Sequence, residues 1–259
     1  MGRLAIFIQL VINLVVGVVV TLFIRDYMFY EKIEIDLGAW SVFYTVYGVL
    51  YAIIVGFILI GALGKFEQLK MTIDSEINEM QNVRDFLTYF SENQKETINE
   101  VREVLSRYIN SIIKKEWEEM IKKESIPEFS MEFGEVITSV ANLKSEDEND
   151  SIALTSIINT LARLTACRTK RIYLSNEEVP PPIMKLLIFM SVVLSVGFII
   201  LGVENFWIHI FMIWSLSTTV QLIINLLTDL NNPFKGVWII DNNHYLGIKK
   251  SIEVRISAG

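Results

Sequence analysis

Residues 40–63 read WSVFYTVYGVLYAIIVGFILIGAL, an unbroken apolar stretch without Asp, Glu, Lys or Arg. A helix needs roughly 20 apolar residues to cross a hydrocarbon core of about 30 Å, because each residue adds about 1.5 Å. Outward from this stretch, three more segments pass the same test, namely residues 4–24, 186–203 and 206–228, the last with His209 near its start. The sequence therefore predicts an all-α integral membrane protein with four spanning helices.

Composition supports a membrane protein and argues against several other classes. Hydrophobic residues make up 52% of the chain and the mean hydropathy is +0.41, above most soluble domains. The net charge of -7 opposes nucleic-acid binding, which requires clustered Lys and Arg. Cys167 is the only cysteine, which rules out an intrachain disulfide. Because no catalytic or cofactor-binding motif is visible either, we expect neither an enzyme nor a resident cofactor.

Basic residues give the orientation of the spans. The two links expected on the outer side, residues 25–39 and 202–205, contain only Arg25 and Lys32 of the 23 basic residues. The positive-inside rule then places both termini in the cytoplasm of a multi-pass plasma-membrane protein. The predicted domains are spans 1 and 2 (1–65), a cytoplasmic helical domain (66–182), a two-span hairpin (183–229) and a cytoplasmic tail (230–259). Apolar stretches of the tail could be extended segments that pack on neighbouring subunits.

The cytoplasmic region shows helical periodicity from residue 66 to residue 123 and again from 152 to 173. Ser91 followed by Gln94 fits a capping box, which predicts a break near Phe90 and a second helix after it. Pro127 and Gly134 interrupt a less regular stretch. The apolar positions of the first region are Leu69, Ile73, Ile77, Met80, Ile98, Val101, Leu105, Tyr108, Ile112 and Trp117.

An acidic run at residues 145–150 has two interpretations. Its carboxylates supply oxygen ligands that a hard cation such as Ca²⁺ prefers, although the EF-hand order with its central glycine is absent. A solvated surface loop is the simpler interpretation. The weak metal-ligand candidates are Glu146, Asp147, Glu148 and Asp150.

Short motifs next to the spans carry a family resemblance. Gly56-Phe57 in the second span precedes residues 65–68 (KFEQ), and the last span leads into residues 229–236 (DLNNPFKG). In this order the motifs resemble the bestrophin channels, whose last span runs into Asn-Pro-Phe-Gly. The likeness is closer to the prokaryotic branch called bestrophin-like, including residues 168–171 (RTKR) and Val179-Pro180. The order and placement of the motifs, rather than any one of them, carry the resemblance.

The resemblance implies a homopentameric ion channel whose axial pore is lined by the second span. The hydrophobic neck of the family then falls on Val49, Ile53 and Phe57, where an apolar ring would gate by dewetting. The alternative is that these residues face lipid, because every side of this helix is apolar. Cyclic assembly is also favoured on physical grounds, since one four-helix subunit has too little interior for a hydrated pathway.

Two departures from the family pattern limit what can be transferred. Bestrophins that sense calcium have a dense acidic run after Asn-Pro-Phe-Gly, whereas Val237, Trp238, Ile239 and Ile240 follow here, which argues against a calcium clasp at this place. Ile53 at the middle of the neck is aliphatic rather than aromatic, so charge selectivity cannot be carried over.

Charges and hydroxyls near the outer side add two weaker candidates. The acidic residues of the first outer link outnumber its basic ones, which favours cations at the mouth of a ring; they are Asp26, Glu31, Glu34 and Asp36. Tyr44, Tyr47 and Tyr51 either line an outer vestibule or pack at interfaces, and packing is favoured.

A second function class must be weighed against the ion channel. The cytoplasmic helices could instead recruit a partner to a membrane-anchored scaffold or signalling protein. A secondary transporter ranks last, because the spans contain no interior proline and no charged residue at the midplane. The expected partners are therefore further copies of the chain, the lipid bilayer and inorganic ions.

Overall fold

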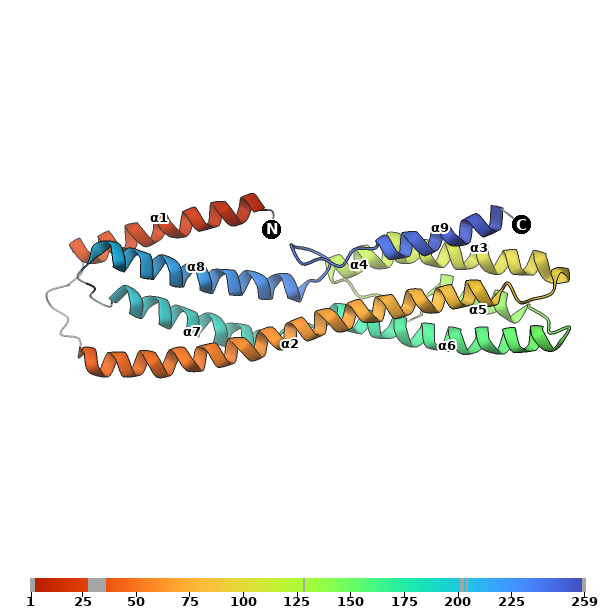
Figure 1. Ribbon diagram of the computed structural model, residues 1–259, viewed down its shortest axis with the longest axis horizontal. Coiled ribbons are helices and arrows are strands. Elements are labelled where there is room, and N and C mark those ends of the chain that lie inside the picture. The colour runs from red at the N-terminus through yellow and green to blue at the C-terminus, as the bar shows by residue number, and fades with distance from the viewer. Residues whose placement is uncertain (1–2, 28–35, 128, 201–202, 204, 258–259) are drawn as a thin grey trace. The chain divides into compact units, whose positions relative to one another are not determined.

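The computed structural model describes residues 3–27, 36–127, 129–200, 203 and 205–257 (Figure 1). Every regular element in these ranges is a helix, as the sequence predicts. The chain divides into two compact units, and the long helix α2 (Leu37–Phe86) contributes to both. Unit 1 comprises Met1–Gly64, Glu178–Asn231 and Gly236–Trp238; unit 2 comprises Lys65–Glu177, Asn232–Lys235 and Ile239–Gly259.

Unit 1 contains the apolar helices. They are α1 (Arg3–Tyr27), the first part of α2, α7 (Pro181–Ile200) and α8 (Phe206–Asn231). By length and composition, three segments of the described chain can cross a membrane, within Gly38–Phe86, Glu148–Ile200 and Phe206–Asn231, and Val11–Val20 is a shorter apolar helix. The predicted first span, residues 4–24, falls inside α1.

Small residues allow close approach between helices of unit 1. Gly17 of α1 faces α8, where an added Cβ would lie 3.6 Å from Ile213 Cγ2. At Gly197 of α7 an added Cβ would meet the hydroxyl end of Tyr44 from α2. The Tyr44 hydroxyl donates to the backbone carbonyls of Val193 and Leu194, each at 3.0 Å. Small residues at such contacts are typical of helices that pack in lipid.

Unit 2 is built around one hydrophobic core. After α2 come the 3₁₀ turn η1 (Glu92–Gln94), α3 (Lys95–Ser111), the π-helical turn η2 (Ile112–Glu116), α4 (Trp117–Lys122), α5 (Met131–Ala141) and α6 (Glu148–Asn176). All ten apolar positions singled out from the periodicity are buried here, so the predicted helical faces are confirmed. Ser130 caps α5 through Phe133 N and Asp147 caps α6 through Asp150 N.

The tail differs from the extended segments considered above. It forms α9 (Asn243–Ser257), whose Tyr245, Ile248 and Ile252 are buried in the core of unit 2. Figure 1 shows α9 running beside α3, and Lys249 Nζ donates to Asn110 Oδ1 of α3 at 3.1 Å. The buried apolar residues of α9 therefore pack within their own chain, whereas other apolar residues of the tail are exposed, namely Val237, Trp238, Ile239, Leu246 and Val254.

Candidate functional site: the apolar stripe of α2

The three predicted neck residues share one exposed face of α2. Val49 is 55% exposed, Ile53 50% and Phe57 73%. The same face continues above and below them with further exposed apolar side chains, since helical periodicity of 3.6 residues aligns these positions. The α2 stripe is defined here as Val42, Val46, Val49, Ile53, Phe57 and Ile60.

The opposite face of α2 packs inside unit 1. At about 100° per residue, Tyr44 and Ala62 lie about 180° around the helix from Ile53. Ala62 is buried, as are Tyr51 and Val55 on the same side. The stripe therefore points away from the other helices of its own unit. Among the described residues no side chain covers the stripe, which leaves lipid and another copy of the chain as the candidates to cover it.

The three tyrosines do not form a row of free hydroxyls. Tyr44 bonds to α7 as described above, and the buried Tyr51 shares a 3.0 Å hydrogen bond with Ser191 Oγ of α7. Tyr47 stacks on Phe43 at a ring-centroid distance of 5.5 Å, and its buried hydroxyl has no hydrogen-bond partner among the described residues. Tyr44 and Tyr51 therefore join helices of one chain.

We expect Tyr51→Phe to weaken the α2–α7 contact modestly. It removes one hydroxyl bond and leaves Ser191 Oγ still donating to the Leu187 carbonyl at 2.8 Å. Interhelical hydrogen bonds in membranes average about 0.6 kcal/mol, so the thermal midpoint in detergent should fall by a few degrees at most. Thermal unfolding curves would measure this shift, with Tyr173→Phe, the same change at an exposed site, as the control. A loss as large as that of a core truncation would contradict this role.

The acidic candidates for an outer mouth are only partly within the described residues. Glu31 and Glu34 lie outside them, and Asp26 belongs to α1 without a described side chain. Asp36 caps the start of α2, where its Oδ1 accepts from Gly38 N at 3.0 Å and Ala39 N at 3.1 Å. A carboxylate at a helix N-terminus is stabilised by the helix dipole.

The acidic run at residues 145–150 lies between α5 and the first turn of α6, and Asp150 links it by hydrogen bonds to the region of η1. Asp150 is buried, and its carboxylate accepts from Ser91 N at 3.0 Å, Gln94 Nε2 at 3.1 Å and Glu146 N at 3.1 Å. Asp147 accepts from Asp150 N at 2.7 Å. Among the described residues no group of three or more His, Cys, Asp or Glu side chains is arranged to hold a metal ion. These two carboxylates accept hydrogen bonds from backbone amides and, at Asp150, also from the Gln94 side chain.

The contacts of Asp150 predict a dependence of stability on pH. Burial by itself raises the pKa of Asp150, but hydrogen bonds from Ser91, Glu146 and Gln94 outweigh it and lower the pKa. A carboxyl with a lowered folded pKa stabilises fully above its unfolded pKa, about 3.9, and loses this as the pH falls through the folded pKa. Asp150→Asn should therefore lower the melting temperature at pH 7, and the gap should close below about pH 3.9.

Melting curves between pH 7 and pH 3 would measure that gap, with Glu148→Gln, an exposed change in the same acidic run, as the control. A gap that stays constant across this range would show that the ionised form of Asp150 contributes nothing.

A buried charge cluster in unit 2 is the main site that the sequence patterns did not reveal. It consists of Glu76 from α2, Glu116 from η2, and Arg168 and Arg171 from α6, each at most 5% exposed. Arg171 Nε donates to Glu76 Oε2 at 2.6 Å and Arg171 Nη2 donates to Glu116 Oε2 at 2.6 Å. Arg168 Nη2 donates to Glu116 Oε1 at 2.8 Å. Two acids and two bases thus neutralise each other.

Two buried tyrosines complete the cluster. The Tyr245 hydroxyl of α9 donates to Glu76 Oε2 at 2.7 Å, and the Tyr108 hydroxyl of α3 lies 3.5 Å from Glu76 Oε1. Burial and the nearby Glu76 charge raise the pKa of both hydroxyls, so they remain protonated donors. Burial alone would raise the pKa of Glu116, but Arg171 and its neighbour Arg168 lower it. The buried polar groups of the cluster are therefore hydrogen-bonded to one another, which is typical of a structural role.

The π-helical turn η2 orients Glu116 towards both arginines. A π-turn inserts an extra residue into the helical repeat, and such turns often occur where a side chain must be re-aimed. Here it spans Ile112–Glu116 and ends on the acid of the cluster. Met120 Sδ, in α4 just after it, lies 3.4 Å from Arg171 Nη1.

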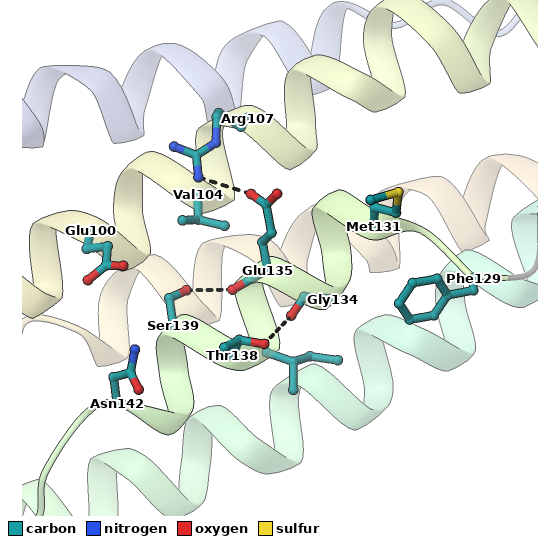
Figure 2. A pocket seen from close by; sticks show the side chains of 11 residues that line it. Glu100, Val104, Arg107, Phe129, Met131, Gly134, Glu135, Thr138, Ser139 and Asn142 are labelled. Atoms are coloured by element: carbon teal, nitrogen blue, oxygen red, sulfur yellow. Dashed lines mark hydrogen bonds and ion pairs between the residues drawn. The ribbon is translucent and has the colours of Figure 1, made fainter.

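A groove of about 730 Å³ lies between α3 and α5 in unit 2 (Figure 2). Arg107 crosses it to Glu135 with a 3.0 Å ion pair. Phe129 and Met131 at its rim are 72% and 75% exposed. The Phe129 ring lies against Gly134, where an added Cβ would come within 3.0 Å of Cζ. The sequence patterns gave no signal for this groove.

Comparison with known proteins adds family and fold. A domain model described as Bestrophin-like matches residues 14–244. A variant of a bacterial bestrophin homologue from Klebsiella pneumoniae superposes with a TM-score of 0.77 at 15% identity, covering 96% of this chain and 99% of that one. A second variant gives 0.76 at 16% identity, covering 97% and 100%. A further structure of this homologue gives 0.74 at 16% identity, covering 95% and 98%. No curated sequence matches the chain significantly.

Proposed function

The chain belongs to the bestrophin-like family, and on that premise we propose that it is a homopentameric ion channel of the plasma membrane. Family and fold support a membrane protein and, at the level of the family, an ion channel. In detail, we propose four membrane-spanning helices, at residues 4–24, 40–63, 186–203 and 206–228, with both termini in the cytoplasm. The second span of each copy lines the axial pore.

The α2 stripe is the observation that carries the proposal. It is exposed in the single chain, and it lies opposite the face that Tyr44 and Tyr51 fasten to α7. A bundle with one helix face turned outward is suited to a ring in which identical faces surround an axis. Because backbone groups of α2 are satisfied within the helix, its side chains alone determine the pore surface.

Val49, Ile53 and Phe57 form the hydrophobic neck in this proposal. A narrow ring of such side chains excludes water and ions until it widens. Acidic residues in the first outer link, including Asp36, would raise the local concentration of cations at the outer mouth. We therefore propose a preference for cations over anions.

Purified protein in planar bilayers tests both parts of the proposal. Under a gradient of KCl, we expect currents whose reversal potential moves towards the equilibrium potential of potassium. A reversal potential that moves towards the chloride equilibrium potential would contradict the cation preference but would still support an ion channel. If the purified protein passes no current under any condition, the channel proposal is wrong. Native mass spectrometry would test whether five copies assemble.

The exposed rim of the α3–α5 groove favours the second candidate, a membrane-anchored scaffold. Phe129 and Met131 would supply apolar contacts to a partner. A chain that is monomeric in mild detergent and silent in bilayers would support the scaffold over the channel.

A further inference from the structure

Large apolar side chains are exposed just beyond the last span. Val237 and Trp238 are each 48% exposed, in the turn Gly236–Trp238 of unit 1, and Ile239, which follows them in the chain, is 55% exposed. Consecutive exposed residues of this size cost free energy in water, at roughly 25 cal/mol for each Å² of apolar surface. Such patches mark contact with a partner or a membrane.

The turn Gly236–Trp238 is fixed to the last turn of α8. Val237 N donates to Asp229 Oδ2 at 3.1 Å. Gly236 has a φ of +133°, and an added Cβ would lie 2.6 Å from Asp229 Oδ1. The backbone conformation and the close carboxylate both require glycine here. The chain therefore folds back here, and the backbone of Val237 is hydrogen-bonded directly to the Asp229 side chain of α8.

This attachment sets the depth of the turn relative to the span. Asp229 directly follows the apolar stretch at residues 206–228. A second contact lies close by along α8, where Asn231 Oδ1 accepts from Val179 N at 3.1 Å, just before α7 begins. Both segments that adjoin the α7–α8 hairpin on this side are thus fastened to the last residues of α8.

We propose that the turn Gly236–Trp238 is a membrane-interface anchor, with Val237 and Trp238 inserted at the boundary between headgroups and acyl chains. This rests on α8 being a span, as proposed above. Tryptophan favours that boundary because its ring is apolar while its N–H needs a polar partner. The turn is attached to Asp229, which directly follows the apolar stretch at residues 206–228, so it lies at the end of that stretch. A lipid surface therefore fits better than a separate protein partner.

Site-directed spin labelling of the full chain in liposomes tests the anchor. In a Cys167→Ser background, single labels are placed by Trp238→Cys, by Phe189→Cys on the exposed side of α7 as a lipid reference, and by Glu148→Cys in the acidic run as a water reference. We expect the label at position 238 to be more accessible to oxygen and less accessible to a water-soluble nickel complex than the label at 148.

Three outcomes separate the alternatives. Nickel accessibility equal to that at position 148 would place the turn in water and overturn the proposal. Loss of accessibility to both reagents would mean that another copy covers the turn, which also overturns it. If Trp238→Cys fails to fold, Val237→Cys provides the same measurement. Adding Asp229→Ala should shift the label at 238 towards the water reference, and an unchanged depth would overturn the role assigned to Asp229.

Discussion

Substituting Arg171 with methionine is expected to lower the free energy of unfolding by about 3–5 kcal/mol, because it leaves two buried carboxylates without their shared partner. Arg171 is fully buried and donates to both Glu76 and Glu116. Methionine fills a similar volume, so the loss reports charge and hydrogen bonds rather than a cavity. Urea unfolding in detergent, followed by tryptophan fluorescence, would measure it, since Trp117 packs on Tyr245 in the same unit.

A surface ion pair on the same helix supplies the matched control. Arg163 donates to Glu79 at 2.8 Å, but its side chain is 53% exposed. Arg163→Met should therefore cost no more than about 1 kcal/mol. Combining Glu76→Met with Arg171→Met should cost less than the sum of the single changes, because Glu116 keeps Arg168. Equal losses at Arg163 and Arg171 would contradict the structural role of the cluster.

The charge cluster occupies positions that periodicity assigns to the core. Along α2, Glu76 falls in the series of buried residues Leu69, Ile73, Met80 and Val83. Along α6, Arg168 and Arg171 continue the series of Ile157, Leu161 and Leu164. Complementary charges in core register on two helices predict a buried pair, since an unpaired buried charge is prohibitively unfavourable. That signal was present in the sequence, although it could not assign the partners.

Local signals around η1 predicted the break but not its chemistry. α2 ends at Phe86 and Ser91 precedes η1, as expected from a restart after Phe90. The capping box itself is wrong, because Ser91 Oγ lies against Asp150 and Gln94 reaches the backbone of Lys144. A carboxylate distant in sequence competed for the same donors, and no local pattern contains that information.

The helix α5 was missed for a related reason. Pro127 and Gly134 indicate an irregular stretch, and Gly134 lowers helix propensity by about 1 kcal/mol relative to alanine. Tertiary packing outweighs this, because Phe133, Val136 and Val140 are buried in the core.

The family resemblance stated from the motifs is confirmed by the domain model across residues 14–244. The neck positions stay a prediction.

The neck prediction has the second large expected effect. Replacing Val49, Ile53 and Phe57 together with alanine should raise the current through reconstituted protein at least about tenfold. A tenfold rise corresponds to a free-energy barrier to ion passage that is about 1.4 kcal/mol lower. Each copy in the ring loses three large apolar side chains, which widens the constriction and weakens its exclusion of water. All three are already exposed in the chain, so truncation creates no internal cavity. Single-channel recording with the oligomer checked by native mass spectrometry would measure the effect.

A second exposed apolar face separates gating from a general effect on membrane packing. Phe189, Val192 and Val196 of α7 are 62%, 53% and 46% exposed, so their triple alanine variant removes a similar set of side chains. If α7 faces lipid, that variant should leave the unitary current unchanged. Equal increases in both variants would point to a loosened assembly. An unchanged current in the α2 variant would instead mean that the α2 stripe faces lipid, and the pore would have to be sought on another helix.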